Sequence, residues 1–361
     1  MLNLKYRLKS CDMIEGGKIL REKRKEFSLN MILVTYVTIV LNNKKTIQNT
    51  IDSVYNQKYS NIEYIIIDGG SIDGTLEILK NNELKIDYFI SEADSGIYNA
   101  LNKAISFARG DLICIVNADD WLFPDSAQKA VALMKDQPKR SVLFSAAVVH
   151  DKRRGKHIWT PKCVNMGSYF ICANVCHNAM YATRETYKFN GFYDESYRVA
   201  GDFEWIMRCL SNNINFIYSN EPLVNYATGG TSSDIEKHGI ECLRVAKNRF
   251  LFLSEDEVEK LFWCFFDPMK NVGPNINSLP PQNCMDFLKN ILSKHPSNFE
   301  FLQAITCASM DKLLHPLDLR WSFHILSLLK NVIISLKVAL FKFSPFLYRF
   351  AKKIRHHNLK I

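Results

Sequence analysis

Residues 62–70 read IEYIIIDGG, a mostly apolar run that ends in an acidic residue and two glycines. A run of this composition, closed by turn residues, predicts a strand that is buried on both faces. Mostly apolar runs at 33–41, 86–90 and 112–116 predict three further strands, and the segments between them space apolar residues three and four apart, as helices do. This alternation predicts an α/β fold with a mostly parallel central sheet flanked by helices.

The pattern becomes mixed beyond residue 121. We expect a strand at 142–149, a helix at 202–210, two short strands at 215–219 and 222–226, and then helices. The resulting organisation is a charged extension (1–30), an α/β domain (31–233, with halves 31–121 and 122–233), a helical segment (234–269), a Pro- and Gly-containing linker (270–283) and a basic, amphipathic helical extension (284–361).

Polar residues follow each of the four predicted strands. The carboxyl ends of parallel strands meet at one edge of a sheet, so we expect Asn42, Asp68, Asp94 and the pair Asp119 and Asp120 to lie close together. Each of them alone is an ordinary turn or capping residue. Together they would bring several carboxylates close to one another, and their mutual repulsion is unfavourable unless a bound cation or a set of donor groups offsets it. The cluster therefore indicates a binding site.

The familiar phosphate-binding loops are missing from this edge. Gly69 and Gly74 are spaced as in a P-loop, but Thr75 stands where that loop needs lysine, and no G-x-G-x-x-G occurs. These absences count against an ATPase and against a Rossmann dehydrogenase. A diphosphate would instead need a divalent cation held by carboxylates, which the sequence Asn-Ala-Asp-Asp at 117–120 can supply.

The net charge of +9 is confined to the last 42 residues. Residues 320–361 contain nine of the 46 Lys and Arg and no Asp or Glu, so the rest of the chain is neutral. A neutral body argues against a nucleic-acid partner. Aromatic, aliphatic and basic residues in 320–361 favour a helix at an anionic membrane surface, although a helix packed on the α/β domain would have a similar pattern.

Neither a secretory signal nor a transmembrane segment is recognisable in the sequence. We therefore expect a cytoplasmic protein that is peripheral on the cytoplasmic face of the membrane. The ten cysteines form no C-x-x-C pair, and the nearest grouping is Cys163, Cys172, Cys176 and His177. We expect reduced thiols there rather than a zinc site.

Eight short motifs in sequence order resemble the family 2 glycosyltransferases, whose fold is the nucleotide-diphospho-sugar transferase (GT-A) fold. The resemblance covers about residues 31–233. The motifs are TIVLN at 38–42, the segment 61–75 around IIIDGGSIDGT, EADSGIYNALNK at 92–103, NADDW at 117–121, HNAM at 177–180, GFYDE at 191–195, GDFEW at 201–205 and GGTS at 229–232.

The resemblance implies roles for individual residues. Asp68 and Asp94 would hold the base and ribose of a nucleotide, Asp119 would lie near the ribose, Asp120 would bind Mg²⁺ or Mn²⁺, and Asp202 would be the general base. The remaining implied residues are Thr38, Val40, Asn42, Gly70 and Asn102 in the nucleotide-sugar site, and His177, Glu204, Trp205, Gly230 and Thr231 on the acceptor side or in support.

Three features qualify these roles. Asn117 replaces the first aspartate that many members have in the metal motif, and Gly201 replaces a glutamate before the catalytic aspartate. Glu204 is the rival base.

The implied reaction is displacement of a nucleoside diphosphate from a sugar by an acceptor hydroxyl. One base without a nucleophile predicts inversion at the anomeric carbon. The acceptor would be a glycan or a lipid-linked molecule in surface polysaccharide or glycolipid synthesis. The alternatives are a sugar-nucleotide pyrophosphorylase and an inactive binding protein that keeps the fold.

Overall fold

The computed structural model describes residues 13–21, 27–151, 155–229, 235–266 and 281–313. The chain forms two compact units. One comprises the residues up to Val164 together with Cys172–Val245, and the other comprises Asn165–Ile171 together with the residues from Ala246 onward. The expected linker at 270–283 lies largely outside the described residues, and the basic segment 320–361 lies wholly outside them.

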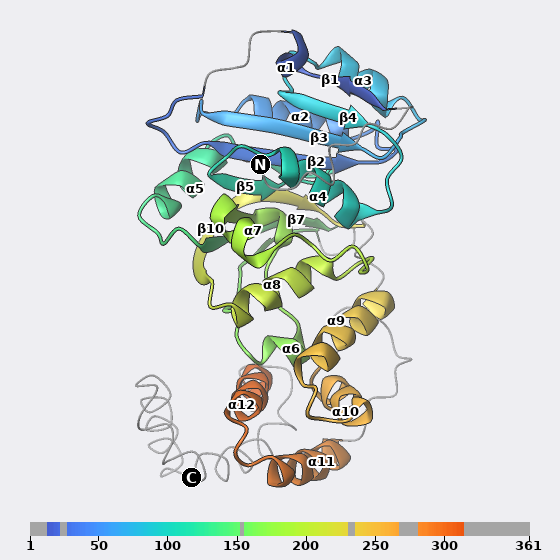
Figure 1. Ribbon diagram of the computed structural model, residues 1–361, viewed down its shortest axis with the longest axis vertical. Helices are drawn as coiled ribbons and strands as arrows, with labels where there is room; N and C mark the ends of the chain where they lie inside the picture. Colours follow the sequence, from blue (N-terminus) through green and yellow to red (C-terminus); the bar gives the residue numbers. More distant parts are fainter. Residues whose placement is uncertain (1–12, 22–26, 152–154, 230–234, 267–280, 314–361) are drawn as a thin grey trace. The chain divides into compact units, whose positions relative to one another are not determined.

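The first unit is built on one large mixed sheet (Figure 1). The four strands predicted from the apolar runs lie side by side and parallel in the order β4-β3-β2-β5. They are β2 (Val34–Val40), β3 (Ile62–Asp68), β4 (Tyr88–Ser91) and β5 (Leu112–Ile115). All seven residues of β3 are buried, as its mostly apolar run predicts.

The remaining strands extend this sheet with mixed direction. Strand β9 (Met180–Thr183) lies antiparallel between β5 and β7 (Ser141–Asp151), and β10 (Asn215–Ala227) runs parallel to β7. Two short strands pair antiparallel with their neighbours, β6 (Trp121–Leu122) with β10 and β8 (Gly155–Trp159) with β7. The sheet is therefore mostly but not wholly parallel.

Two segments differ from the sequence prediction. The strands expected at 215–219 and 222–226 form one strand, because register shifts beside Pro222 let the ladder continue past it. Within the expected extension 1–30, β1 (Ile14–Gly16) pairs with the outer edge of β4, followed by the short α1 (Lys18–Arg21). A short strand in this place covers part of an otherwise open edge.

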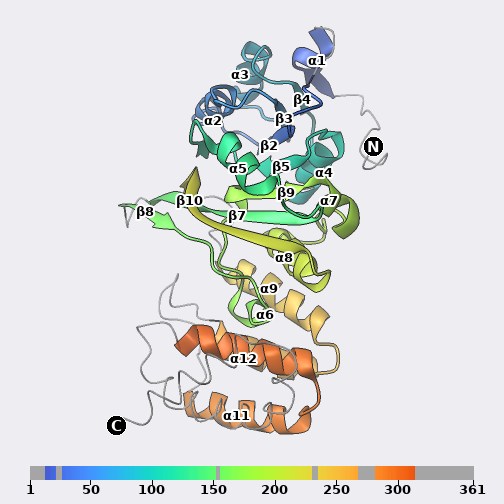
Figure 2. The same ribbon diagram turned by 90° about the vertical axis from the view of Figure 1, so that its left-hand side faces the viewer.

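Helices cover both faces of the sheet (Figure 2). Helices α2 (Ile47–Tyr55), α3 (Thr75–Asn81) and α5 (Ser126–Met134) pack on one face through a shared apolar core. The opposite side carries α4 (Ile97–Phe107), α7 (Arg184–Asn190) and α8 (Gly201–Ser211). This layering is the one predicted for βα units.

The second unit is helical. It contains α6 (Ser168–Ile171), α10 (Glu255–Phe265), α11 (Pro281–Lys294) and α12 (Phe299–Leu313), while α9 (Ile235–Arg249) belongs to the first unit as far as Val245. Its core is aromatic, with the Phe170 and Phe250 rings stacked at 5.0 Å.

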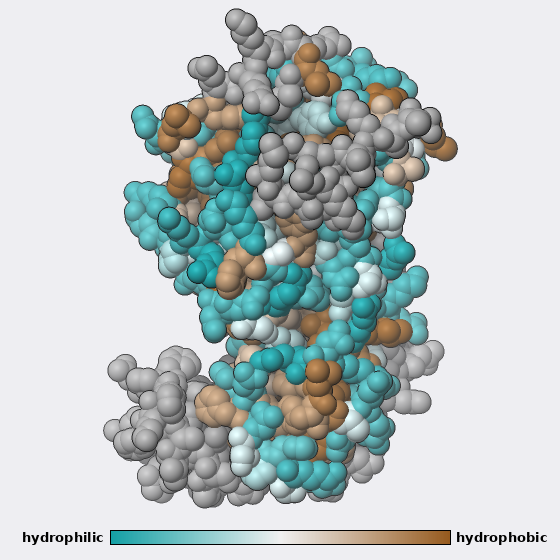
Figure 3. Space-filling view, in the orientation of Figure 1, coloured by the Kyte–Doolittle hydropathy of each residue, from teal (hydrophilic) through white to brown (hydrophobic). Residues whose placement is uncertain are grey.

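In the part of the chain that the structure describes, no helix is long and apolar enough to cross a membrane. On the face shown in Figure 3, hydrophilic side chains predominate and apolar ones form separate groups.

Candidate active site

The loops after β2, β3 and β4 are joined by hydrogen bonds at the carboxyl edge of the sheet. Asn42 has a left-handed φ of 51°, and its side-chain oxygen accepts from the backbone N–H of Ile72 at 2.9 Å. The backbone N–H of Asn42 donates to the Ser71 hydroxyl at 2.7 Å. That hydroxyl in turn donates to Asp68. The edge predicted from the sequence is therefore a connected, preorganised structure.

Asp68 is fully buried at the end of β3. Besides the Ser71 hydroxyl, its carboxylate accepts from the Ser71 N–H at 3.0 Å and from the Ser91 hydroxyl of β4 at 2.6 Å. Several neutral donors thus stabilise the buried charge. Asp94 lies close by, because a Cβ placed on Gly69 would come within 2.8 Å of its Oδ2 atom. Glycine at position 69 allows these two acidic loops to approach each other, and Gly70 follows with a φ of 84°.

The Asn117–Asp120 segment after β5 is anchored to α2. The hydroxyls of Thr46 and Thr50 donate to the carbonyls of Ala118 (2.9 Å) and Asp120 (2.7 Å). Asp119 is partly exposed, whereas Asp120 is fully buried. Burial raises the pKa of Asp119, and burial together with the neighbouring Asp119 charge raises the pKa of Asp120 to about 8.

Both oxygens of Asp120 accept hydrogen bonds from distant parts of the chain. The Asn178 side chain donates to Oδ2 at 2.5 Å, and the backbone N–H of Ala227 donates to Oδ1 at 2.8 Å. Within the described ranges no Lys or Arg forms an ion pair with Asp119 or Asp120. Two adjacent carboxylates without a cationic side chain match a site that binds a divalent cation. A cation on Asp120 would share a carboxylate oxygen with either the Asn178 side chain or the Ala227 N–H, which already donate to it. The Asp119 carboxylate is partly exposed and accessible.

Asp202 lies in the first turn of α8 and is held by Tyr98 of α4. The Tyr98 hydroxyl accepts from the backbone N–H of Gly201 at 2.8 Å and of Asp202 at 3.2 Å, and it donates to Asp202 Oδ1 at 3.3 Å. Oδ1 also accepts from the Phe203 N–H at 2.8 Å. No described residue donates to Oδ2, so this oxygen can accept a proton.

The glycine at position 201 is explained by the same contact. A Cβ there would lie 2.7 Å from the Tyr98 ring. The departure from the family pattern noted at this position therefore lets Tyr98 approach the start of α8.

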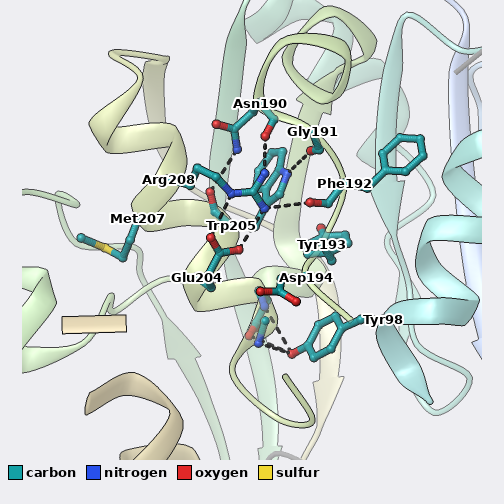
Figure 4. A network of polar contacts seen from close by, with 12 residues as sticks. Tyr98, Asn190, Gly191, Phe192, Tyr193, Asp194, Glu204, Trp205, Met207 and Arg208 are labelled. Carbon is teal, nitrogen blue, oxygen red and sulfur yellow. Dashed lines mark hydrogen bonds and ion pairs between the residues drawn. The ribbon is translucent and has the colours of Figure 1, made fainter. Parts of the chain in front are cut away.

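Glu204 is fully engaged by Arg208 one helical turn later (Figure 4). Its two oxygens accept from Nε and from a terminal nitrogen of Arg208, each at 2.9 Å. Arg208 also donates to the backbone carbonyls of Asn190 and Phe192. The bidentate pair thus secures the loop between α7 and α8, and it leaves Glu204 less suited than Asp202 to act as a base.

The other acceptor-side residues divide into buried and partly exposed ones. Trp205 is fully buried, donates to the Gly191 carbonyl at 2.8 Å and stacks on Tyr187 at 4.8 Å, so it supports the fold. His177 is partly exposed, and one of its ring nitrogens lies 2.8 Å from the Tyr193 hydroxyl. Desolvation lowers the pKa of His177, and the negative charge of Asp202 opposes this. Gly230 and Thr231 lie outside the described residues.

Three residues predicted for the nucleotide-sugar site have their side chains in the interior. Thr38 donates to the Val116 carbonyl at 2.8 Å, and Val40 is buried at the end of β2. Asn102 exchanges hydrogen bonds of 2.9 Å with the backbone of Tyr193. Thr38 and Asn102 thus join neighbouring parts of the unit, and the part of all three residues in binding a nucleotide sugar stays a prediction.

Three residues with clear structural roles here were not assigned from the sequence: Tyr98, Asn178 and Glu241. The carboxylate of Glu241 in α9 accepts from the N–H groups of Arg198, Val199 and Ala200 at 2.7–2.8 Å, just before α8. Tyr98 and Asn178 occur in the motifs quoted above, but their partners lie 104 and 58 residues away. Only the folded chain reveals such contacts.

Comparisons with known proteins point to one family. The family model described as "Glycosyl transferase family 2" matches residues 35–184. A Mycobacterium tuberculosis protein named as an uncharacterized glycosyltransferase is 32% identical over 181 residues, which are 48% of this chain and 68% of the relative.

A PGL/p-HBAD biosynthesis glycosyltransferase of Mycobacterium bovis is 25% identical over 166 residues, 45% of this chain. The chain spans 63% of the length of that relative. Among solved structures, residues 1–349 of Staphylococcus aureus TarS in complex with UDP-GlcNAc align with a TM-score of 0.50 and 16% identity, covering 84% of this chain and 81% of that one. This last likeness concerns the fold.

Proposed function

Because the chain belongs to the family 2 glycosyltransferases, we propose that it transfers a sugar from a nucleotide-diphospho-sugar to an acceptor hydroxyl, in the synthesis of a surface polysaccharide or glycolipid. One observation carries this proposal. Tyr98 comes from the half that bears the acidic edge, and it hydrogen-bonds to Asp202 of the other half. The Oδ2 atom of Asp202 accepts no hydrogen bond from the described residues. A base held in this way would lie near both the nucleotide-sugar donor and the acceptor hydroxyl.

The donor would bind at the carboxyl edge of β2, β3 and β4. Asp68 and Asp94 would accept hydrogen bonds from the base and the ribose, since their loops approach each other across Gly69. Asn42 and Gly70 would shape the same wall through backbone groups, as their left-handed conformations fix the course of the two loops. The UDP-GlcNAc complex of TarS has a comparable fold, which is consistent with a nucleotide sugar as the donor.

The diphosphate would lie beside Asp119 and Asp120. We infer that this pair holds Mg²⁺ or Mn²⁺, which would supply positive charge to the departing diphosphate. The protein's own contribution is to fix the two carboxylates: Asn178 and Ala227 orient Asp120, and the hydroxyls of Thr46 and Thr50 hold the backbone of the segment. Asp119 would face the ribose and the open side of the site.

Asp202 would accept the proton of the acceptor hydroxyl at Oδ2 while Tyr98 and Phe203 hold Oδ1. A retaining reaction would need a second carboxylate free to attack the sugar. Glu204, two residues away, has both oxygens bound to Arg208. The arrangement therefore favours inversion with a single base. His177, near the Asp202 charge, would contact the acceptor.

A lipid-linked or glycan acceptor fits the basic segment 320–361. Nine basic residues without an acid would draw this segment to an anionic membrane surface, with each basic residue worth about 1 kcal/mol. The enzyme would then be peripheral on the cytoplasmic face.

The decisive experiment incubates the full chain with a panel of nucleotide sugars and Mg²⁺ or Mn²⁺, and measures release of nucleoside diphosphate by mass spectrometry. We expect turnover with at least one donor, a loss of roughly 10²-fold or more in Asp202→Asn, and unchanged binding of the nucleoside diphosphate in that variant. Glu204→Gln is the matched control and should retain turnover.

Three results would refute the proposal. They are a folded chain that turns over no donor, a product pattern that requires a nucleoside triphosphate as in a pyrophosphorylase, and loss of turnover in Glu204→Gln but not in Asp202→Asn.

A further inference from the structure

Three side chains that commonly ligate metals meet at a place that the proposed reaction does not use. Cys172 follows α6 in sequence, and His238 and Cys242 lie on α9. The ligand atoms of all three lie within 4.8 Å of one another. His238 and Cys242 are four residues apart, so they occupy the same face of the helix. The sequence grouping around Cys163 did not predict this cluster, because its partners lie more than 60 residues beyond Cys172.

The distances suit a tetrahedral zinc ion. With Zn–S near about 2.3 Å and Zn–N near about 2.1 Å, such an ion spaces a sulfur and a nitrogen about 3.6 Å apart and two sulfurs about 3.8 Å apart. Cys242 Sγ lies 3.6 Å from Nδ1 and 3.8 Å from Nε2 of His238. The Nδ1 distance matches the sulfur-to-nitrogen spacing imposed by one shared ion, and one ring nitrogen is all that the ion requires.

We propose that Cys172, His238 and Cys242 form a zinc site with two thiolates, one imidazole and a water molecule as the fourth ligand. Thiolate and imidazole ligands select a borderline-soft ion such as Zn²⁺ over the hard cations expected at Asp119 and Asp120. The two metal sites would therefore have different chemistry.

Burial and backbone conformation distinguish the two cysteines of the cluster. The Cys242 thiol is fully buried. Cys172 has a left-handed φ of 61°, which is rare for a residue with a side chain.

The site would also stiffen the support of the proposed base. Glu241, next to Cys242, holds the three N–H groups that precede α8. Zinc would tie this part of α9 to Cys172 and so fix the start of the helix that carries Asp202. This consequence rests on the proposed function, whereas the zinc site itself does not.

The test is metal analysis of the full chain, purified under reducing conditions without chelator, followed by replacement of zinc with Co²⁺. We expect roughly one zinc per chain and a sulfur-to-cobalt charge-transfer absorption, which carboxylate ligands do not give. Cys172→Ser, His238→Gln and Cys242→Ser should each lower metal affinity by more than the roughly 10–100-fold that follows loss of a supporting contact. Cys163→Ser, at an exposed cysteine of the same unit, should leave the metal content and the absorption unchanged.

Four outcomes would overturn the proposal: no zinc and no charge-transfer absorption in the intact chain, unchanged binding in the variants, the same loss in Cys163→Ser, or a Cys172–Cys242 disulfide in place of the metal. If Cys242→Ser does not fold, Cys172→Ser and His238→Gln decide, because both side chains are partly exposed. Donor turnover is measured separately, so that failure of the zinc site and failure of sugar transfer are distinguishable.

Discussion

Binding of Mn²⁺ to the Asp119–Asp120 pair should strengthen about 50-fold between about pH 6 and about pH 8, because Asp120 must lose its proton to serve as a ligand. Its pKa in the folded chain is about 8. With this pKa, Asp120 is ionised in about 1% of the molecules at about pH 6 and in about half of them at about pH 8. Below its pKa each pH unit then changes the apparent affinity about tenfold, or about 1.4 kcal/mol.

The metal-free protein should show the opposite dependence. The folded pKa of Asp120 is raised above the unfolded value of about 4, so between about pH 4 and about pH 8 the folded chain holds a proton that the unfolded chain has lost. The contribution of Asp120 to the free energy of unfolding therefore falls as pH rises through this window. Asp120→Asn, which stays neutral, should remove this dependence.

Two measurements check the reasoning. Electron paramagnetic resonance counts free Mn²⁺ in titrations across the pH range, and thermal unfolding without metal reports the stability of the wild type and of Asp120→Asn. A flat affinity between about pH 6 and about pH 8 would refute the role given to Asp120. The same pH dependence in Asp120→Asn, with its loss in Asp119→Asn, would move the direct contact to Asp119.

Tyr98→Phe should lower the free energy of unfolding by about 1–3 kcal/mol, because the N–H groups of Gly201 and Asp202 lose their acceptor. It should also lower kcat while the KM for the donor stays unchanged; an unaltered kcat in steady-state kinetics would argue against positioning of Asp202 by Tyr98. Deletion of residues 320–361 should move the protein from the membrane pellet to the soluble fraction with donor hydrolysis intact. A folded truncated chain that still pellets would contradict the membrane role.

Much of the first half of the fold follows from local pattern. The runs that became β2, β3, β4 and β5 are mostly apolar because both faces are buried, and this composition can be recognised without a structure. Their parallel direction then places the polar residues that follow them along one edge. The sequence alone therefore predicts that Asp68 and Asp94 lie close together.

The second half depends on contacts between distant residues. Strand β9 is four residues long and has no distinctive alternation, so its place inside the sheet was not predictable. The orientation of Asp120 is set by Asn178 and Ala227, and that of Asp202 by Tyr98. The interior position of Thr38 depends on which face of β2 its side chain occupies, which the motif around it does not reveal.

The position of β9 also governs how this protein can be made. Strand β5 pairs with β2 along one edge and with β9 along the other. In the second pairing Leu112 lies opposite Thr183, and Cys114 lies opposite Tyr181. About 70 residues must leave the ribosome after β5 before that edge is covered, which takes about 4 to 14 s at ordinary rates of synthesis. During this interval the nascent chain presents an apolar strand edge that can pair with other chains. The sheet therefore cannot be completed during synthesis until β9 has followed β5 out of the ribosome.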